Sequence, residues 1–181
     1  MPVATVDQVD QTATDINSIA EASAGKNSIV VNISEQMLYL YAGDNVVVSY
    51  PISTSKYGIG SEAGSNKTPL GQHIIVSKIG EGAVEGTIFK SRVNTGKIAV
   101  MNAPGAGDLV TTRILWLKGL EPGKNAGGQV DSYNRFIYIH GTAEEKFIGK
   151  PASHGCIRMK NTDVVDLFNR VLEDTLVNII P

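Results

Sequence analysis

The sequence is short of several residues and patterns that mark common classes of protein. It holds one cysteine in 181 residues, which excludes an internal disulfide framework and a cysteine-rich zinc site. Its 16 Lys and Arg residues are outnumbered by 18 Asp and Glu residues, so it lacks the basic excess typical of nucleic-acid-binding domains. It also lacks an apolar run of about 18 residues, so we expect no transmembrane helix and no membrane partner. With 42% hydrophobic residues, the chain is predicted to form one ordinary globular domain.

Three common enzyme motifs are incomplete or missing. Gly123-Lys124 lacks the upstream glycine of a phosphate-binding loop, and Gly58-Ile59-Gly60 lacks the full spacing of a dinucleotide-binding loop. No Gly-x-Ser-x-Gly nucleophile elbow occurs. We therefore expect no cofactor and no metal, so any catalysis must come from the side chains themselves.

The first residues lack the marks of an export signal. No basic segment followed by an apolar segment occurs in Met1–Asp10. We therefore expect a cytoplasmic protein, or a periplasmic one if a signal peptide was removed. Apolar residues near helical spacing from Val6 to Ala24 predict an amphipathic helix packed on the domain, the alternative being a frayed tail. The expected organisation is an N-terminal helical extension (1–26) followed by one main domain (27–181).

Short apolar runs bounded by turn residues dominate the rest of the chain. They predict strands at 28–34, 36–41, 46–50, 72–78, 86–90, 97–100, 111–117, 135–140 and 175–180. One amphipathic run, Asn161–Val171, predicts a helix capped by Asn161 or Thr162, with Asp163 suited to its positive end. This pattern favours a β-sandwich or a related β-rich architecture with helices packed outside.

The single cysteine lies in the most informative stretch, Tyr138–Met159. A cysteine is a good nucleophile only as a thiolate, so it needs a base or a cation beside it. His154 lies two residues before Cys156, and His140 ends the predicted strand 135–140, sixteen positions upstream of the cysteine. The alternative is that Cys156 is a small buried hydrophobic residue with no chemistry.

His140 is the candidate general base, because an imidazole accepts a thiol proton near neutral pH and leaves a thiolate–imidazolium pair. The alternative is a histidine that is merely hydrogen-bonded at a strand end. Gly141 and Thr142 are expected to turn the chain, so that a folded loop brings Cys156 back toward the ring. His154 is the candidate to bind substrate or to hold the loop. The stretch places no Asp or Asn to orient the imidazole.

The residues around Cys156 offer contacts for a substrate. The N–H groups of Gly155 and Cys156 form a candidate oxyanion hole, because glycine leaves the main chain uncovered. Arg158 shares a face with the cysteine in an extended segment, and its guanidinium is expected either to bind a substrate carboxylate or to order the loop. Ser153 and Thr142 either add hydroxyl contacts to the substrate or serve only the fold.

These segments resemble the signature of the YkuD family, the L,D-transpeptidase catalytic domain. The resemblance is carried by I-H-G-T at 139–142, S-H-G-C-I-R-M at 153–159, Q-x-L-Y-L-Y from Gln36, Y-P-I-S from Tyr50 and T-P-x-G from Thr68. It implies a sandwich of two mixed sheets, with the cysteine loop at one edge. It also implies that the carbonyl of Gly141 orients the imidazole. Some family members carry Asn where this chain has Arg158.

The resemblance implies acyl transfer on peptidoglycan stem peptides. Cys156 would attack the bond between the L-centre of diaminopimelate and the following D-Ala, and D-Ala would leave. The missing export signal favours water as the acceptor, hence an L,D-carboxypeptidase that trims tetrapeptides in murein recycling. The alternative is an L,D-transpeptidase that forms 3-3 cross-links or exchanges D-amino acids in the periplasm. The expected partners are a peptidoglycan tetrapeptide or muropeptide, and a carbapenem that acylates Cys156.

Two other classes of function compete with this hypothesis. A metal hydrolase could use His140, His154 and Cys156 as ligands, which matches a catalytic zinc site in ligand count. However, two of these ligands are very close in sequence, and no carboxylate base accompanies them. A wall-binding module without activity could also keep the fold, but the intact Cys–His pair argues against it.

Overall fold

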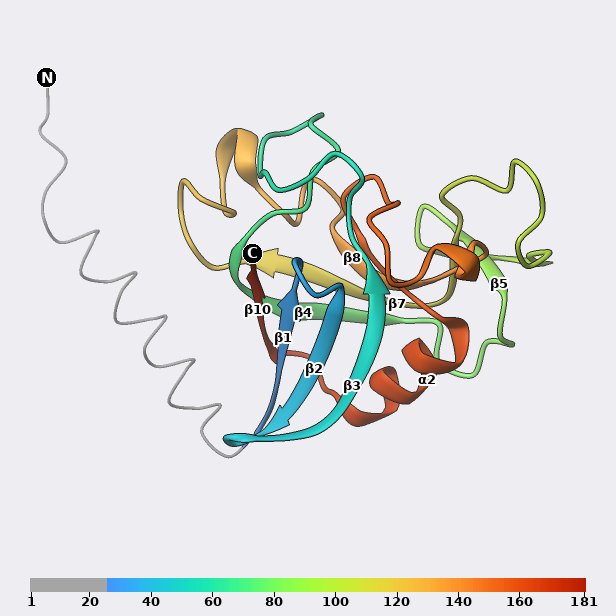
Figure 1. Ribbon diagram of the computed structural model, residues 1–181, viewed down its shortest axis with the longest axis horizontal. Coiled ribbons are helices and arrows are strands. Elements are labelled where there is room, and N and C mark those ends of the chain that lie inside the picture. The colour runs from blue at the N-terminus through green and yellow to red at the C-terminus, as the bar shows by residue number, and fades with distance from the viewer. Residues whose placement is uncertain (1–25) are drawn as a thin grey trace, which may run out of the picture.

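The structure, a computed structural model, describes residues 26–181, so the helix expected at Val6–Ala24 lies outside the described residues. The described part is a ten-stranded β structure with one α-helix and two short 3₁₀ helices (Figure 1). The strands are β1 (Asn27–Asn32), β2 (Met37–Ala42), β3 (Asn45–Ser53), β4 (Gly71–Ile79), β5 (Thr87–Lys90), β6 (Val93–Ile98), β7 (Val110–Gly119), β8 (Tyr138–Thr142), β9 (Ile157–Met159) and β10 (Leu176–Ile180). The helices are η1 (Gly128–Val130), η2 (Glu145–Phe147) and α2 (Asn161–Arg170).

The strands form one mixed sheet that closes on itself. Its order is β4-β10-β1-β2-β3-β9-β8-β7-β5-β6, and β4 also pairs with β7. The β1–β10 and β8–β9 pairs are parallel, and the others are antiparallel. In Figure 1, β1, β2 and β3 lie in front, and β4 and β7 run crosswise behind them. The β-rich, mixed fold is therefore confirmed, with one refinement: the two expected sheets are joined, because β4 pairs with a strand of each layer.

Along the strands of this ring, buried side chains that point inward alternate with more exposed ones that point outward. In β2, for example, Leu38 and Leu40 are buried while their neighbours are half-buried. Buried apolar side chains from the ring strands form one cluster, and α2 packs Val164, Leu167 and Phe168 against it. Burial of such side chains is the main stabilising term for the domain.

A second, smaller apolar cluster lies on the outer face of β7 and β8. It contains Phe89, Ile114 and Tyr138, with Trp116 and Cys156 packed against it. These positions alternate with residues of β7–β9 that belong to the main core, so their side chains point to the opposite face of the sheet. Cys156 therefore projects from the outer face, beside Tyr138.

Two strands start several residues away from their predicted first residue, whereas the others start within about one residue of it. β6 starts at Val93 rather than Lys97, because Ser91 and Arg92 adopt φ values of 47° and 66° and reverse the chain at once. β8 covers Tyr138–Thr142 rather than 135–140, because Phe136 has a φ of 55° and lies in a turn. The prediction that Gly141 and Thr142 turn the chain is wrong: they continue β8 and pair with Thr111 and Val110 of β7.

The helix after the cysteine loop forms where it was predicted, with Asp163 in its first turn. Its start differs from the prediction, since Lys160 is the N-cap and no side chain of the cap residue bonds to the helix. Instead, Glu145 Oε1 accepts the Asn161 N–H at 2.8 Å. A carboxylate suits the positive end of a helix as well as a cap hydroxyl does.

His73 is buried in β4 and serves the fold. Its ring contacts Gly71 O and Ser132 Oγ, each at 2.9 Å. Burial lowers the pKa of His73 to about 4, so the ring is neutral at pH 7. None of the helices within residues 26–181 is long and apolar enough to cross a membrane.

Candidate active site

Cys156 is carried by a loop, residues 152–156, that is tied firmly to its neighbours. The Ser153 N–H donates to Thr54 O at 2.9 Å, and the Lys56 N–H donates to Ser153 O at 3.1 Å. The Ser153 hydroxyl closes the loop on itself by donating to Cys156 O at 2.6 Å. These bonds fix the main chain on both sides of the cysteine.

Gly155 is required by the shape of the loop. Its φ is +125°, a conformation that side chains rarely adopt, and a Cβ there would lie 3.3 Å from Lys67 O. Its carbonyl accepts the Thr68 hydroxyl at 3.0 Å, and its N–H donates to Ser153 Oγ at 3.2 Å. By contrast, the Cys156 N–H makes no hydrogen bond to any of the described residues. Of the two N–H groups predicted for an oxyanion hole, that of Cys156 is therefore the free one.

Cys156 is partly exposed, and its thiol contacts the main chain of β8 and of the segment just before it. It donates to Phe136 O and accepts the Tyr138 N–H, both at 3.3 Å. Burial raises the pKa of the thiol to about 12, and the charge of Asp108 acts in the same direction. The Tyr138 N–H and the nearby cations Arg158 and Arg135 oppose this rise without cancelling it.

His140 lies on the same face of the sheet as Cys156. In the parallel β8–β9 pair, His140 stands opposite Arg158, so Tyr138 is level with the cysteine. Because alternate residues share a face, the imidazole and the thiol are diagonal neighbours, with Cα atoms about 8 Å apart from strand spacing and rise. The ring contacts Gly141 O through Nδ1 at 2.6 Å. A carbonyl only accepts, so Nδ1 carries the proton and Nε2 is left as an acceptor.

Burial lowers the pKa of His140, since the ring is cut off from water. The negative charge of Asp108 and the bond to Gly141 O oppose this, whereas Arg158 adds to it. Burial thus disfavours the charged forms of both His140 and Cys156, and so acts against the thiolate–imidazolium pair expected from the sequence.

Gly141 lets β8 pack closely against its neighbours. A Cβ at this position would lie 2.6 Å from Asn161 Oδ1 and 2.7 Å from Thr111 O. The Asn161 oxygen cannot easily move, because it also accepts the hydroxyl groups of Thr111 and Thr112. The glycine at 141 is thus needed for space, and it supplies the carbonyl that holds His140.

We expect Gly141→Ala to lower the free energy of unfolding by about 1–3 kcal/mol, the usual cost of overpacking. Urea unfolding followed by circular dichroism would measure it. Gly60→Ala is the matched control, because a Cβ there meets only flexible carbons of Lys67, at 2.7 Å and beyond. Equal unfolding midpoints for the two variants would show that the close approach at Gly141 carries no constraint.

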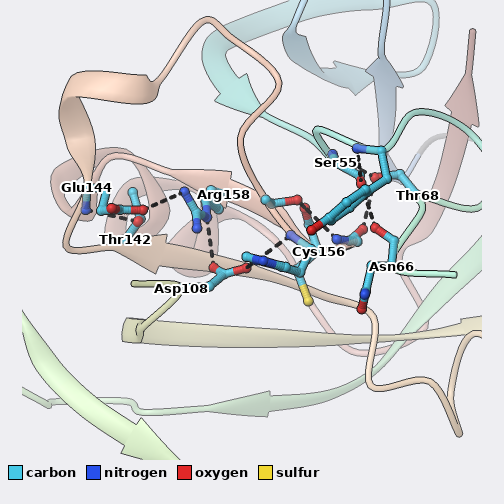
Figure 2. Close-up of polar contacts among 12 residues, drawn as sticks. Ser55, Asn66, Thr68, Asp108, Thr142, Glu144, Cys156 and Arg158 are labelled. Carbon is cyan, nitrogen blue, oxygen red and sulfur yellow. Dashed lines mark hydrogen bonds and ion pairs between the residues drawn. The ribbon is translucent and has the colours of Figure 1, made fainter. Parts of the chain in front are cut away.

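Arg158 is fully buried and held by two carboxylates. Its Nε donates to Asp108 Oδ1 at 2.8 Å, and its Nη1 donates to Glu144 Oε2 at 3.1 Å. Figure 2 shows the guanidinium between these two groups. Asp108 Oδ2 also accepts the N–H and the Nδ1 of His154, at 3.0 and 2.9 Å. With its charge already paired, Arg158 is placed to order the loop rather than to bind a substrate carboxylate.

The other predicted contact residues differ in exposure. Ser153 and Thr142 are fully buried, and their hydroxyl groups bond within the protein, Thr142 to the Glu144 N–H at 3.0 Å. The prediction that they contact substrate is therefore not supported, because neither hydroxyl faces solvent. His154 keeps 43% of its side chain exposed and lies beside Tyr57, with ring centroids 5.8 Å apart.

The match to a known family spans almost all of the described chain. Residues 26–179 match YkuD, the L,D-transpeptidase catalytic domain. The chain belongs to this family. The resemblance inferred from the His and Cys segments is thereby confirmed for this L,D-transpeptidase domain.

Curated relatives agree with this assignment. The domain is 30% identical over 161 residues to the probable L,D-transpeptidase YcfS of Escherichia coli (strain K12), covering 87% of this chain and 45% of that protein. It is 33% identical over 160 residues to the probable L,D-transpeptidase ErfK/SrfK of Salmonella typhimurium, covering 86% and 44%. A third relative, the putative L,D-transpeptidase YkuD of Bacillus licheniformis, is 27% identical, with 84% and 65% covered. The chain thus spans 44–65% of the length of these relatives.

Solved structures show the same fold at low identity. An L,D-transpeptidase from Xylanimonas cellulosilytica matches with a TM-score of 0.54 and 17% identity, covering 92% of this chain and 69% of that one. L,D-transpeptidase 3 from Mycobacterium tuberculosis, in complex with a faropenem-derived adduct, also gives 0.54 and 17%, covering 86% and 60%. These matches support the fold of the L,D-transpeptidase domain described above.

Several residues of the site were not foreseen from the sequence. Asp108 and Glu144 surround Arg158, Thr68 holds the Gly155 carbonyl, and Asn161 fixes the strand that bears His140. Two of them lay close to a visible signal: Thr68 begins the T-P-L-G segment, and Glu144 follows I-H-G-T by two residues. Nothing in the glycine-rich stretch before β7 set Asp108 apart.

A hollow of about 480 Å³ opens beside the cysteine loop of the L,D-transpeptidase domain. Its lining includes Lys56, Phe147, Lys150, Ala152 and His154. Residues 26–181 contain no group of three His, Cys, Asp or Glu side chains placed to hold an ion. The predicted ligands instead face different partners: His154 bonds to Asp108, and Cys156 bonds to the main chain.

Proposed function

We propose that this protein is a cysteine acyl-transfer enzyme that acts on peptidoglycan stem peptides, at the bond between the L-centre of diaminopimelate and D-Ala. The observation that carries the proposal is the β8–β9 register, by which His140 and the partly exposed Cys156 are diagonal neighbours on one face of the sheet. Membership of the L,D-transpeptidase family supports this choice of substrate.

In the first step, His140 Nε2 takes the thiol proton of Cys156 while Sγ attacks the carbonyl carbon, so an S–C bond forms. The negative charge that develops on the carbonyl oxygen is received by the Cys156 N–H, which has no other bond to the described residues. His140 then returns the proton to the departing amine, the C–N bond breaks, and D-Ala leaves. The Gly141 carbonyl keeps Nδ1 protonated throughout, which leaves Nε2 to exchange the proton.

The acyl group then passes to an amine or to water. We propose an amine as the main acceptor, because three curated relatives are named probable or putative L,D-transpeptidases. The L,D-carboxypeptidase expected from the sequence is the second candidate. That expectation depended on the first residues of the chain, which lie outside the described part.

The deciding experiment supplies purified protein with a defined tetrapeptide and a free D-amino acid, and follows the products by mass spectrometry. Exchange of D-Ala for the added amino acid, or dimer formation, is expected to exceed release of tripeptide. A tripeptide excess would instead establish the carboxypeptidase. If no D-Ala is released under any condition, the proposed function fails in both forms.

A further inference from the structure

The Asp108 carboxylate contacts both flanks of Cys156. It lies in the connection between β6 and β7, 48 positions before the cysteine in the chain. One oxygen accepts Arg158 Nε at 2.8 Å, and the other accepts the N–H and Nδ1 of His154 at 3.0 and 2.9 Å. These two partners stand two residues after and two residues before the cysteine. A single side chain from a distant segment thus clamps the whole loop.

Asp108 also places negative charge beside His140. Arg158 stands opposite His140 in the β8–β9 pair, and the charge of its partner Asp108 acts on the imidazole and raises its pKa. Together Asp108, Glu144 and Arg158 carry one excess negative charge when ionised. Burial favours the neutral form of Asp108, but the positive charges of His140 and Arg158 and two hydrogen bonds outweigh it and lower its pKa. Asp108 is therefore ionised at neutral pH.

The groups that face His140 shift its pKa in opposite directions. Burial and Arg158 disfavour a positive ring, whereas Asp108 and the Gly141 carbonyl favour one. The carbonyl cannot supply a full charge, so Asp108 is the group best placed to stabilise the imidazolium. Glu144 accepts Nη1 of the same guanidinium but makes no hydrogen bond to His154. It therefore does not clamp the loop, and it is not among the groups that shift the pKa of His140.

We propose that Asp108 is the positioning residue of this active site: it clamps both sides of the Cys156 loop and stabilises the imidazolium that His140 becomes when it takes the thiol proton. The inference rests on the proposed function. It assigns to a residue outside the His and Cys segments the part that an aspartate plays in a Ser-His-Asp triad, although Asp108 acts through space and through Arg158.

Asp108→Asn and Glu144→Gln form a matched pair, since each removes one negative charge from the same arginine. Acylation of Cys156 by a carbapenem would be timed by intact mass between pH 5 and 9. Asp108→Asn is expected to slow acylation about 10- to 100-fold at pH 7, because an ion partner of this kind shifts a neighbouring group strongly. It should also move the acid limb of the pH–rate profile to lower pH. The reason is that a His140 with a lower pKa stays neutral, and so able to accept a proton, in more acidic solution. Glu144→Gln should leave the limb unmoved, because Glu144 is not among the groups that shift the pKa of His140.

The result has three readings. The inference is overturned if the acid limb of Asp108→Asn lies at the same pH as that of the wild type. It is also overturned if Glu144→Gln moves the limb as far as Asp108→Asn does. A wild-type protein that forms no adduct at all refutes the proposed function instead. If Asp108→Asn does not fold by near-UV circular dichroism, Asp108→Glu keeps the charge and must retain the wild-type limb. A shifted limb in that variant would also count against Asp108.

A second measurement does not require activity. In a Cys156→Ala background, the ring protons of His140 can be titrated by NMR with and without Asp108→Asn. The titration is expected to move to lower pH when the carboxylate is neutralised. An unmoved titration would show that Asp108 only braces the loop.

Discussion

Replacing Cys156 with alanine is expected to abolish both D-Ala release from a tetrapeptide and adduct formation with a carbapenem. The rate should fall on the order of 10⁶-fold, the loss that follows removal of a covalent nucleophile. The chain has no second cysteine that could substitute. Product release would be followed by liquid chromatography with mass spectrometry, and the adduct by intact mass.

Cys156→Ser is the control that separates chemistry from folding. Its hydroxyl can still accept the Tyr138 N–H and donate to Phe136 O, so the loop keeps the contacts that the thiol makes. Serine is nevertheless expected to be nearly inactive, because a hydroxyl is a much weaker acid than a thiol. If the alanine variant folds and still releases D-Ala, Cys156 is not the nucleophile. A wall-binding module without activity would show no turnover in the wild type either.

The strands of the core were predictable because their signal is local. Short apolar runs bounded by turn residues identify β2, β4 and β7 without knowledge of their partners. The turn-bounded ends were less predictable. Ser91, Arg92 and Phe136 adopt left-handed conformations with no glycine to announce them, so β6 and β8 were misplaced by several residues.

The residues of the site also differ in how far the sequence could predict them. Cys156 and His140 lie in a contiguous segment, so their types and spacing could be interpreted directly. The ion pairs of Arg158 could not be predicted, because they involve two carboxylates brought in by tertiary packing, one of them from before β7. The expected thiolate likewise depended on burial, which raises the pKa of Cys156 to about 12 and which no short segment shows.

Replacing His140 with asparagine is expected to slow acylation of Cys156 by about 10²- to 10⁴-fold, the contribution of a positioned general base. The physical reason follows from the resting state. Because burial raises the pKa of the thiol to about 12, the thiolate is scarce at pH 7, and attack on a substrate needs help from a base. His140 can supply that help because Nδ1 is fixed on Gly141 O at 2.6 Å and Nε2 is free to accept.

A small alkylating agent tests this resting state independently of the substrate. Iodoacetamide reacts with the thiolate, so its rate with the wild type should rise about tenfold per pH unit through neutral pH, with no plateau below the thiol pKa. The same profile is expected for His140→Asn, because the sulfur bonds to Phe136 O and Tyr138 N–H rather than to the ring. A resting thiolate–imidazolium pair would behave differently, with a neutral plateau that disappears in the variant. Acylation that depends on His140 while alkylation does not would establish the imidazole as a base that acts during the reaction.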